Sequence, residues 1–183
     1  TTGVKPKPDK PSNTVQRVHM ALGDADAAFK DADIIVERSF KSKTVHQGYI
    51  EPHAVVAEWC EDGQARIWCS SQGHFMVRAL TARLLNLEVA QVRVMPAEIG
   101  GGFGGKTIIF IEPTAVLLAR KAERPVRIVM SRDEVFRATG PAPGSSIDVK
   151  IGAKKNGMLV AAVGEFRFQA GAFPGSPLGP ACM

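Results

Sequence analysis

The sequence predicts an α+β fold in which a mixed β-sheet with hairpins packs against helices. Two pairs of short apolar segments flank Asp62-Gly63 and Asn156-Gly157, and a glycine after Asp or Asn between such segments is a strong β-hairpin signal. Elsewhere, apolar residues recur with the 3.6-residue period of a helix. Because hairpins and helices are interspersed along the chain, we expect parallel and antiparallel strands in the same sheet.

The expected elements follow one another from the N-terminus. Ala25, Ala28 and Phe29 share one side of a short first helix. Ser131 and Glu134 have the Ser-x-x-Glu spacing of a capping box, which opens another short helix. In order, we expect a helix at 24–32, a strand at 34–45, hairpin strands at 55–59 and 65–69, a helix at 75–87, a strand at 92–99, a helix at 112–121, a strand at 126–130, a short helix after Ser131, and hairpin strands at 147–151 and 158–169.

Composition and charge narrow the class of protein. Hydrophobic residues are 45% and charged residues 22% of the 183 residues, as in ordinary globular proteins. The net charge is +5, but the basic residues are not interleaved with stacking aromatics, so we expect no nucleic-acid partner. Three cysteines without a CxxC spacing argue against a disulfide framework or a zinc site, and the cytoplasm is the default compartment. Since no apolar run approaches the roughly 18 residues of a membrane helix, we expect no membrane partner.

The two ends of the chain differ from its middle. Residues 1–14 begin with TTGVKPKPDKPS and are expected to be a linker or tail, because they contain little to bury. We expect one domain over residues 15–183. The last residues, GAFPGSPLGPACM, close no visible element, and the chain has no initiator Met. We therefore expect a fragment that is truncated at its C-terminus.

The strongest local signal is the glycine cluster GGGFGGKT at Gly100–Thr107. A chain accepts so many glycines where its backbone must approach a ligand or take a positive φ. The segment satisfies the phosphate-loop pattern GxxxxGK[ST], which predicts a nucleotide-binding domain as one alternative. The residues before the cluster do not fit a phosphate loop, because they alternate polar and apolar side chains and include Pro96. A phosphate loop normally follows a buried parallel strand that is almost entirely apolar.

A second reading of the cluster comes from resemblance. GGGFGGK resembles the glycine-rich loop in the large subunit of molybdenum hydroxylases, the xanthine dehydrogenase and aldehyde oxidase family. Three other segments are similar to that family in the same order: HQGYIEPH at 46–53, SSQG at 70–73 and RPVRIVMSRDE at 124–134. The resemblance covers roughly residues 18–170. It implies that residues 15–183 are the first half of a molybdenum-cofactor-binding domain.

The resemblance also implies a cofactor site. Gln72 matches the family glutamine whose amide donates a hydrogen bond to an oxygen on molybdenum, and Phe103-Gly104 matches the backbone that approaches the metal's apical ligand. We therefore expect Gln72, Gly102, Phe103 and Gly104 to bind molybdenum-molybdopterin, which carries the redox chemistry in this family. A helix starting near Thr107 is expected to point its N-terminus toward this anionic cofactor.

For the other polar residues, the sequence favours a structural role over a catalytic or ligand-binding one. Glu51 is expected to be mainly structural, and Lys106 to anchor the loop rather than to catalyse. His46, His53 and His74 do not have the spacing of a closed metal site, so we expect satisfied or surface histidines and no metal ligands. We assign no catalytic residue, because the family's general-base Glu and the second half of the pocket have no counterpart here. The chain alone is therefore expected to bind the cofactor weakly and to be inactive.

The resemblance implies part of a catalytic large subunit that hydroxylates an aldehyde or N-heterocycle oxidatively. Its implied partners are the remainder of the large subunit, iron–sulfur and FAD subunits or domains that take the electrons, and a small-molecule substrate. Purine-oxidising members have a Glu and an Arg where this chain has Thr107 and Ala142, so we expect a substrate other than xanthine. A non-catalytic assembly domain is the other alternative to the nucleotide-binding domain.

Overall fold

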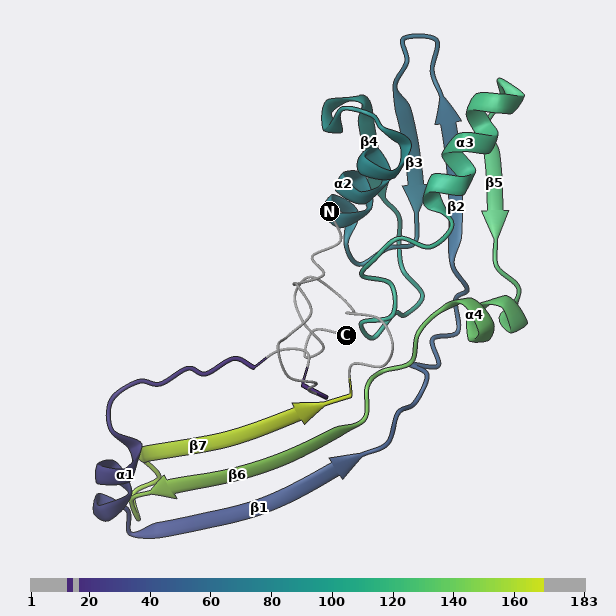
Figure 1. The fold of residues 1–183 in the computed structure, drawn as a ribbon. Helices are drawn as coiled ribbons and strands as arrows, with labels where there is room; N and C mark the ends of the chain where they lie inside the picture. The colour runs from purple at the N-terminus through teal and green to yellow at the C-terminus, as the bar shows by residue number, and fades with distance from the viewer. Residues whose placement is uncertain (1–12, 15–16, 170–183) are drawn as a thin grey trace. The chain divides into compact units, whose positions relative to one another are not determined.

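The computed structural model describes residues 13–14 and 17–169, which belong to two compact units (Figure 1). The first unit contains the described residues up to Ser42 and from Ser145 onward, and the second contains Lys43–Gly144. The elements in chain order are α1 (Ala25–Ala28), the 3-10 helix η1 (Phe29–Asp31), β1 (Ile34–Ser42), β2 (Ala54–Trp59), β3 (Ala65–Cys69), α2 (His74–Leu85), the 3-10 helix η2 (Val89–Gln91), β4 (Val92–Pro96), α3 (Glu112–Ala122), β5 (Val126–Val129), α4 (Arg132–Ala138), β6 (Ser145–Ala153) and β7 (Leu159–Phe168).

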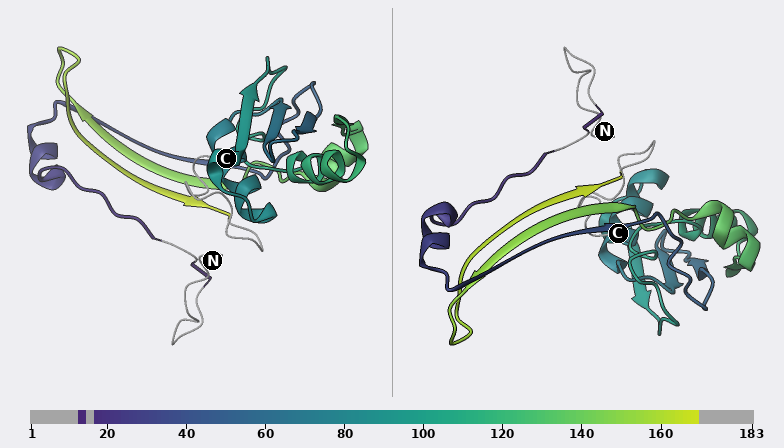
Figure 2. Two further views of the ribbon diagram at one scale, coloured as in Figure 1. Left: turned by 90° about the horizontal axis from the view of Figure 1, so that it is seen from above. Right: turned by 90° about the horizontal axis from the view of Figure 1, so that it is seen from below.

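The first unit is a three-stranded antiparallel sheet in the order β1-β6-β7. Its strands run side by side as long, curved ribbons, with α1 at one end of the sheet (Figure 2). Asp24 caps α1 by accepting a hydrogen bond from the Ala27 amide at 3.0 Å, as expected for an N-cap aspartate. Gly157 takes a φ of +89° in the β6–β7 turn, so the predicted hairpin is confirmed.

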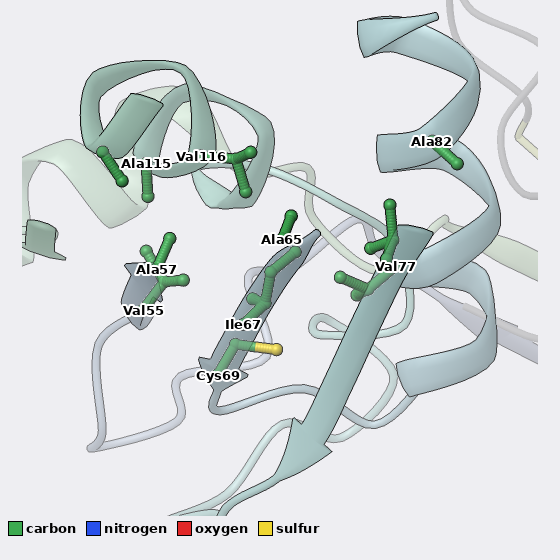
Figure 3. Packing of buried hydrophobic residues seen from close by; sticks show 11 residues of the cluster. Val55, Ala57, Ala65, Ile67, Cys69, Val77, Ala82, Ala115 and Val116 are labelled. Carbon is green, nitrogen blue, oxygen red and sulfur yellow. The ribbon is translucent and has the colours of Figure 1, made fainter. Parts of the chain in front are cut away.

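The second unit is built on a four-stranded sheet in the order β4-β3-β2-β5. Strand β3 pairs antiparallel with β2 and parallel with β4, so the predicted mixed sheet is confirmed in this unit. Helices α2 and α3 cover one face of this sheet (Figure 3). Their apolar side chains pack on alternate residues of β2 and β3, and the buried set is Val55, Ala57, Ala65, Ile67, Cys69, Val77, Ala82, Val92, Ala115, Val116 and Ala119.

Among the boundaries that differ from the sequence-based expectation, two are explained by proline. The expected helix at 112–121 is confirmed as α3, but the helix start near Thr107 that the resemblance implied is wrong, because α3 begins at Glu112. A helix started at Thr107 would place Pro113 in its interior, where proline removes a hydrogen bond and clashes with the preceding turn, whereas Pro113 fits the first turn of α3. Strand β4 ends at Pro96 rather than at Ile99, because proline has no N–H to continue the ladder.

The assignment of residues 15–183 to a single domain stays a prediction. Over the residues that the structure describes, no helix is both long and apolar enough to span a lipid bilayer.

Candidate functional site

The glycine loop between β4 and α3 has an unusual backbone. Gly101 and Gly104 have φ values of +98° and +88°, and Phe103 has a φ of +49°. Positive φ is uncommon for a non-glycine residue and costs on the order of 1 kcal/mol or more, so it persists only where the surroundings impose it. Phe103 is 71% exposed, so the loop presents an aromatic residue to the solvent.

An ion pair clamps the two ends of this loop. One carboxylate oxygen of Glu51 accepts hydrogen bonds from the Gly100 amide at 2.8 Å and from the Lys106 ammonium at 2.7 Å. Lys106 is completely buried, and its Nζ also lies 5.1 Å from the centre of the Tyr49 ring. Glu51 therefore ties the first glycine of the loop to the lysine that ends it, and Lys106 has the anchoring place expected from the sequence.

Several of the glycines are required by close packing. A Cβ on Gly100 would lie 2.7 Å from Glu51 Cβ, and one on Gly105 would lie 2.7 Å from the Tyr49 ring. A Cβ on Gly102 would lie 2.5 Å from Gln72 Oε1. Real Cβ atoms do not approach other heavy atoms this closely, so the loop is shaped by the residues beneath it as well as by any ligand above it.

Gln72 lies in the turn from β3 into α2 and has a fixed orientation. Its side-chain oxygen accepts from the Gly104 amide at 3.1 Å and from the Lys106 amide at 3.2 Å. Its backbone amide donates to the Lys106 carbonyl at 2.8 Å. Because the oxygen is occupied by two donors, the amide NH₂ group is the part of this exposed side chain that is left to bind a ligand.

A cavity of about 820 Å³ adjoins this turn within the second unit. Gln72, Gly73 and Thr107 line one part of it, and apolar side chains that include Phe75 and Val94 line much of the rest. His74 also lines it, and its Nε2 is buried without a hydrogen-bond partner among the described residues. The expectation of satisfied or surface histidines therefore does not hold for this atom.

A buried polar network lies directly under the loop. The Tyr49 hydroxyl lies 2.9 Å from His53 Nε2 and donates to the Thr139 hydroxyl at 3.3 Å. His46 Nε2 lies 3.0 Å from the Thr139 hydroxyl. The Thr139 hydroxyl in turn donates to the Val135 carbonyl at 2.6 Å. Each hydroxyl has several partners, so the network can hold Tyr49 rigidly against Gly101 and Gly105.

We expect protein stability to fall in acid because of His53. Burial, with the nearby positive charge of Lys106 as a smaller cause, lowers the pKa of His53 from 6.5 to about 4. The unfolded chain therefore binds a proton on this residue at a higher pH than the folded chain does. The resulting loss, on the order of 3 kcal/mol, should develop as the pH falls from about 6.5 to about 4. Urea unfolding across this range measures it. His53→Gln should flatten the profile, and an equally steep profile in that variant would contradict the assignment.

The geometry does not match a phosphate loop. Lys106 is committed to Glu51, β4 lies at an edge of its sheet, and α3 begins five residues beyond Thr107. In a phosphate loop the lysine reaches the terminal phosphates and the following helix begins at the loop itself. We therefore expect titration calorimetry with ATP and Mg²⁺ to show no binding. A micromolar dissociation constant would contradict this expectation.

The structure brings the predicted site residues together and adds others. Gln72 contacts Gly102 and Gly104, and Phe103 lies between these glycines in the same loop. The sequence did not predict a role for Tyr49, which packs against Gly101 and Gly105, or for Thr139, which bonds to Tyr49. The sequence feature that could have drawn attention to Tyr49 is that it is the chain's single tyrosine and lies four residues before His53.

Comparisons with known proteins agree with this arrangement. The sequence model of a family described as the molybdopterin cofactor-binding domain matches residues 6–183. The nicotinate dehydrogenase large molybdopterin subunit of Eubacterium barkeri is 34% identical over 172 residues, which cover 94% of this chain and 40% of that protein. The probable hypoxanthine oxidase XdhD of Escherichia coli (strain K12) is 32% identical over 170 residues, which cover 93% of this chain and 18% of that protein.

A solved structure shows the same fold. The aldehyde oxidoreductase from Desulfovibrio gigas superposes with a TM-score of 0.62 at 28% identity, over 79% of this chain and 16% of that one. The chain thus spans 40% or less of each of these three proteins. On the evidence of the family match and these relatives, the chain belongs to the molybdopterin cofactor-binding domain family, which forms part of the large subunits of molybdenum hydroxylases.

Proposed function

We propose that this chain forms one wall of the molybdenum-cofactor site in the large subunit of a molybdenum hydroxylase. The reaction is the oxidative hydroxylation of an aldehyde or an N-heterocycle. The observation that supports this most directly is the orientation of Gln72, whose oxygen is held by the glycine loop and whose NH₂ group is left to donate. A neutral donor suits an oxygen-bearing metal centre, because it stabilises negative charge without competing as a ligand.

The residues present fit such a cofactor. Gln72 would donate through its amide, and the backbone of Gly102, Phe103 and Gly104 would approach the same group. Among the described residues, the N–H groups of Gly102 and Phe103 have no hydrogen-bond acceptor, and Phe103 is exposed, so its N–H is available to an anionic ligand. When bound, the cofactor supplies the redox chemistry, and this chain supplies orientation, hydrogen bonds and a rigid loop.

The remaining parts of the enzyme lie outside these residues. The proposal places the general-base Glu and the second half of the pocket in the remainder of the large subunit. Electrons would leave through iron–sulfur and FAD subunits or domains. Within the described residues, no group of three His, Cys, Asp or Glu side chains could hold a metal ion, so in this proposal molybdenum is held through its pterin and not by this chain.

The proposed substrate class rests on two uncharged residues, Thr107 and Ala142. The Thr107 hydroxyl donates to the Gly104 carbonyl at 3.1 Å, and Ala142 pairs with Val45 through backbone hydrogen bonds. Neither residue offers a charge to the polar edge of a purine, and a site without such partners discriminates poorly in favour of purines. The names of the relatives cover nicotinate, hypoxanthine and aldehydes, so the proposal depends on these residues and not on the names.

We expect the complete enzyme to contain molybdenum and to prefer aldehydes or N-heterocycles to xanthine. Metal analysis, followed by steady-state kinetics with xanthine, hypoxanthine, simple aldehydes and N-heterocycles in parallel, tests both parts. A complete enzyme that binds no molybdenum would refute the proposed function. A molybdenum-loaded enzyme with a higher kcat/KM for xanthine would refute only the interpretation of Thr107 and Ala142.

A further inference from the structure

A buried carboxylate lies just beyond the glycine loop, at the start of α3. Glu112 is 2% exposed and is the first residue of that helix. It forms no ion pair with any cation that the structure describes. A buried charge is costly unless hydrogen bonds satisfy it, so the backbone around Glu112 has to supply its partners.

The turn between the loop and α3 provides these partners. The Glu112 carboxylate accepts a hydrogen bond from the Phe110 amide at 2.7 Å. Burial raises the pKa of Glu112 above its usual value, whereas hydrogen bonding by the Phe110, Glu112 and Ile111 amides opposes the rise. The positive end of the α3 dipole also favours an anion at this place. Glu112 therefore closes the turn through which the chain leaves the glycine loop.

The amide that Glu112 holds belongs to a residue that packs under the loop. The Phe110 ring lies edge-on to the His53 ring, with 4.5 Å between the ring centres, and it packs against the hydrophobic cluster that contains Tyr49. His53 Nε2 lies 2.9 Å from the Tyr49 hydroxyl. The Tyr49 ring in turn lies so close to Gly105 that a Cβ there would be 2.7 Å from it. A continuous set of contacts thus leads from Glu112 to the underside of the loop.

Glu112 also lies close to the strand that leads to Gln72. Burial raises the pKa of the Cys69 thiol to about 12, and the negative charge of Glu112 is the smaller cause. Cys69 ends β3 (Figure 3), and Gln72 follows it in the turn into α2. Ile111 packs against both hydrophobic clusters of this unit. The turn at 110–112 is thus the joint between the core of the sheet and the residues that hold the glycine loop.

We propose that Glu112 is a positioning residue for the glycine loop. By holding the Phe110 amide, it keeps the Phe110 ring against His53 and thereby fixes Tyr49 beneath the loop. This role requires a hydrogen-bond acceptor at position 112, and a side chain of the same size without one does not suffice. The inference rests on the proposed function only in treating the loop as part of a cofactor site.

Two substitutions of similar size separate positioning from packing. Glu112→Gln keeps an oxygen that can accept from the Phe110 amide, whereas Glu112→Met has no oxygen. Tyr49 is the chain's single tyrosine, so isotope-labelled tyrosine gives one ring spectrum by NMR, which reports on the residue under the loop. In the folded 183-residue chain, we expect this spectrum to stay unchanged in Glu112→Gln and to shift or broaden in Glu112→Met. A merely structural role would change the stability of these variants without moving the Tyr49 signals.

Hydrogen exchange and a matched control complete the measurement in this chain. The Gly105 amide donates to the Gly102 carbonyl at 2.8 Å, and its exchange should become about tenfold faster in Glu112→Met only. Asp62 is the control, because it also accepts from an amide two residues away, that of Gln64 at 3.1 Å, but in the exposed turn at the far end of β2 and β3. Asp62→Asn and Asp62→Leu should both leave the Tyr49 signals and the Gly105 exchange unchanged.

The complete enzyme shows whether the positioning serves the reaction. At equal molybdenum content, Glu112→Met is expected to lower kcat about tenfold and Glu112→Gln to stay near the wild type, because a small displacement of orienting groups lowers turnover. Identical Tyr49 spectra in Glu112→Met and the wild type would overturn the proposal, and so would equal changes in Glu112→Gln and Glu112→Met. A normal kcat in a loaded Glu112→Met enzyme would also overturn it. The Tyr49 measurement needs no cofactor, so its failure is distinct from a failure of the proposed function.

Discussion

Replacement of Glu51 by alanine is expected to lower the free energy of unfolding by about 3 kcal/mol. The reason is that Lys106, which is wholly buried, would lose its only carboxylate partner among the described residues. An unpaired buried charge costs several kcal/mol, and we take the lower end because the Glu51 side chain is 31% exposed. Gly100 would lose its acceptor in the same variant, so the glycine loop should also become mobile. Urea unfolding measures the stability, and hydrogen exchange of the loop amides measures the mobility.

A double-mutant cycle separates this cause from simple loss of contacts. Lys106→Met removes the charge but keeps an apolar stem, so the double variant Glu51→Ala/Lys106→Met should be more stable than Glu51→Ala alone. Asp133→Ala is the matched control, because it breaks an exposed ion pair with Arg137 and should cost at most about 1 kcal/mol. A double variant that is less stable than Glu51→Ala would show that Lys106 is not held as a buried charge.

Replacement of Gln72 in the complete enzyme is expected to lower turnover about thirtyfold. A hydrogen bond to a charged group is worth about 1.5–3 kcal/mol, and the loss of about 2 kcal/mol from the transition state corresponds to this factor. Gln72→Ala also removes the acceptor for the Gly104 and Lys106 amides, so it should disturb the loop as well. Gln72→Glu keeps that acceptor and replaces the donor by a negative charge, and it should lose turnover with near-normal stability.

Kinetics at equal molybdenum content measure the effect. The turnover of both variants is compared with that of the wild type, and urea unfolding of the same samples gives their stability. Unchanged turnover in a fully loaded Gln72→Glu enzyme would mean that the amide NH₂ group does not serve the reaction. A loss in Gln72→Ala alone would assign Gln72 a purely structural role in holding the loop.

Local features of the fold could be predicted from the sequence because a few adjacent residues determine them. Asp24 caps α1, and Ser131 and Glu134 form both hydrogen bonds of the predicted capping box. Gly63 and Gly157 adopt the positive φ that their hairpin turns require. In each case the physical cause lies within four residues of its effect, so the pattern is visible in the sequence.

The remaining features depend on residues that are distant in the sequence. Glu51 and Lys106 are 55 positions apart, and Gln72 and Gly104 are 32 apart, so no local pattern predicts either contact. The pairing of β1 with β6 joins segments more than 100 residues apart, and it separates the strands into two sheets where one was expected. The resemblance placed Gln72 and the loop in one site, but it could not give the orientation of the amide or identify the clamp beneath it.

The structure of the complete, cofactor-loaded enzyme at high resolution tests the central claim most directly. The measured quantity is the distance from the Gln72 amide nitrogen to the nearest polar atom of the bound cofactor. We expect about 3 Å, with the side-chain oxygen still accepting from the Gly104 amide. A cofactor whose nearest atom lies beyond about 6 Å, or an amide turned so that its oxygen faces the ligand, would contradict the claim that this loop and Gln72 form a wall of the site.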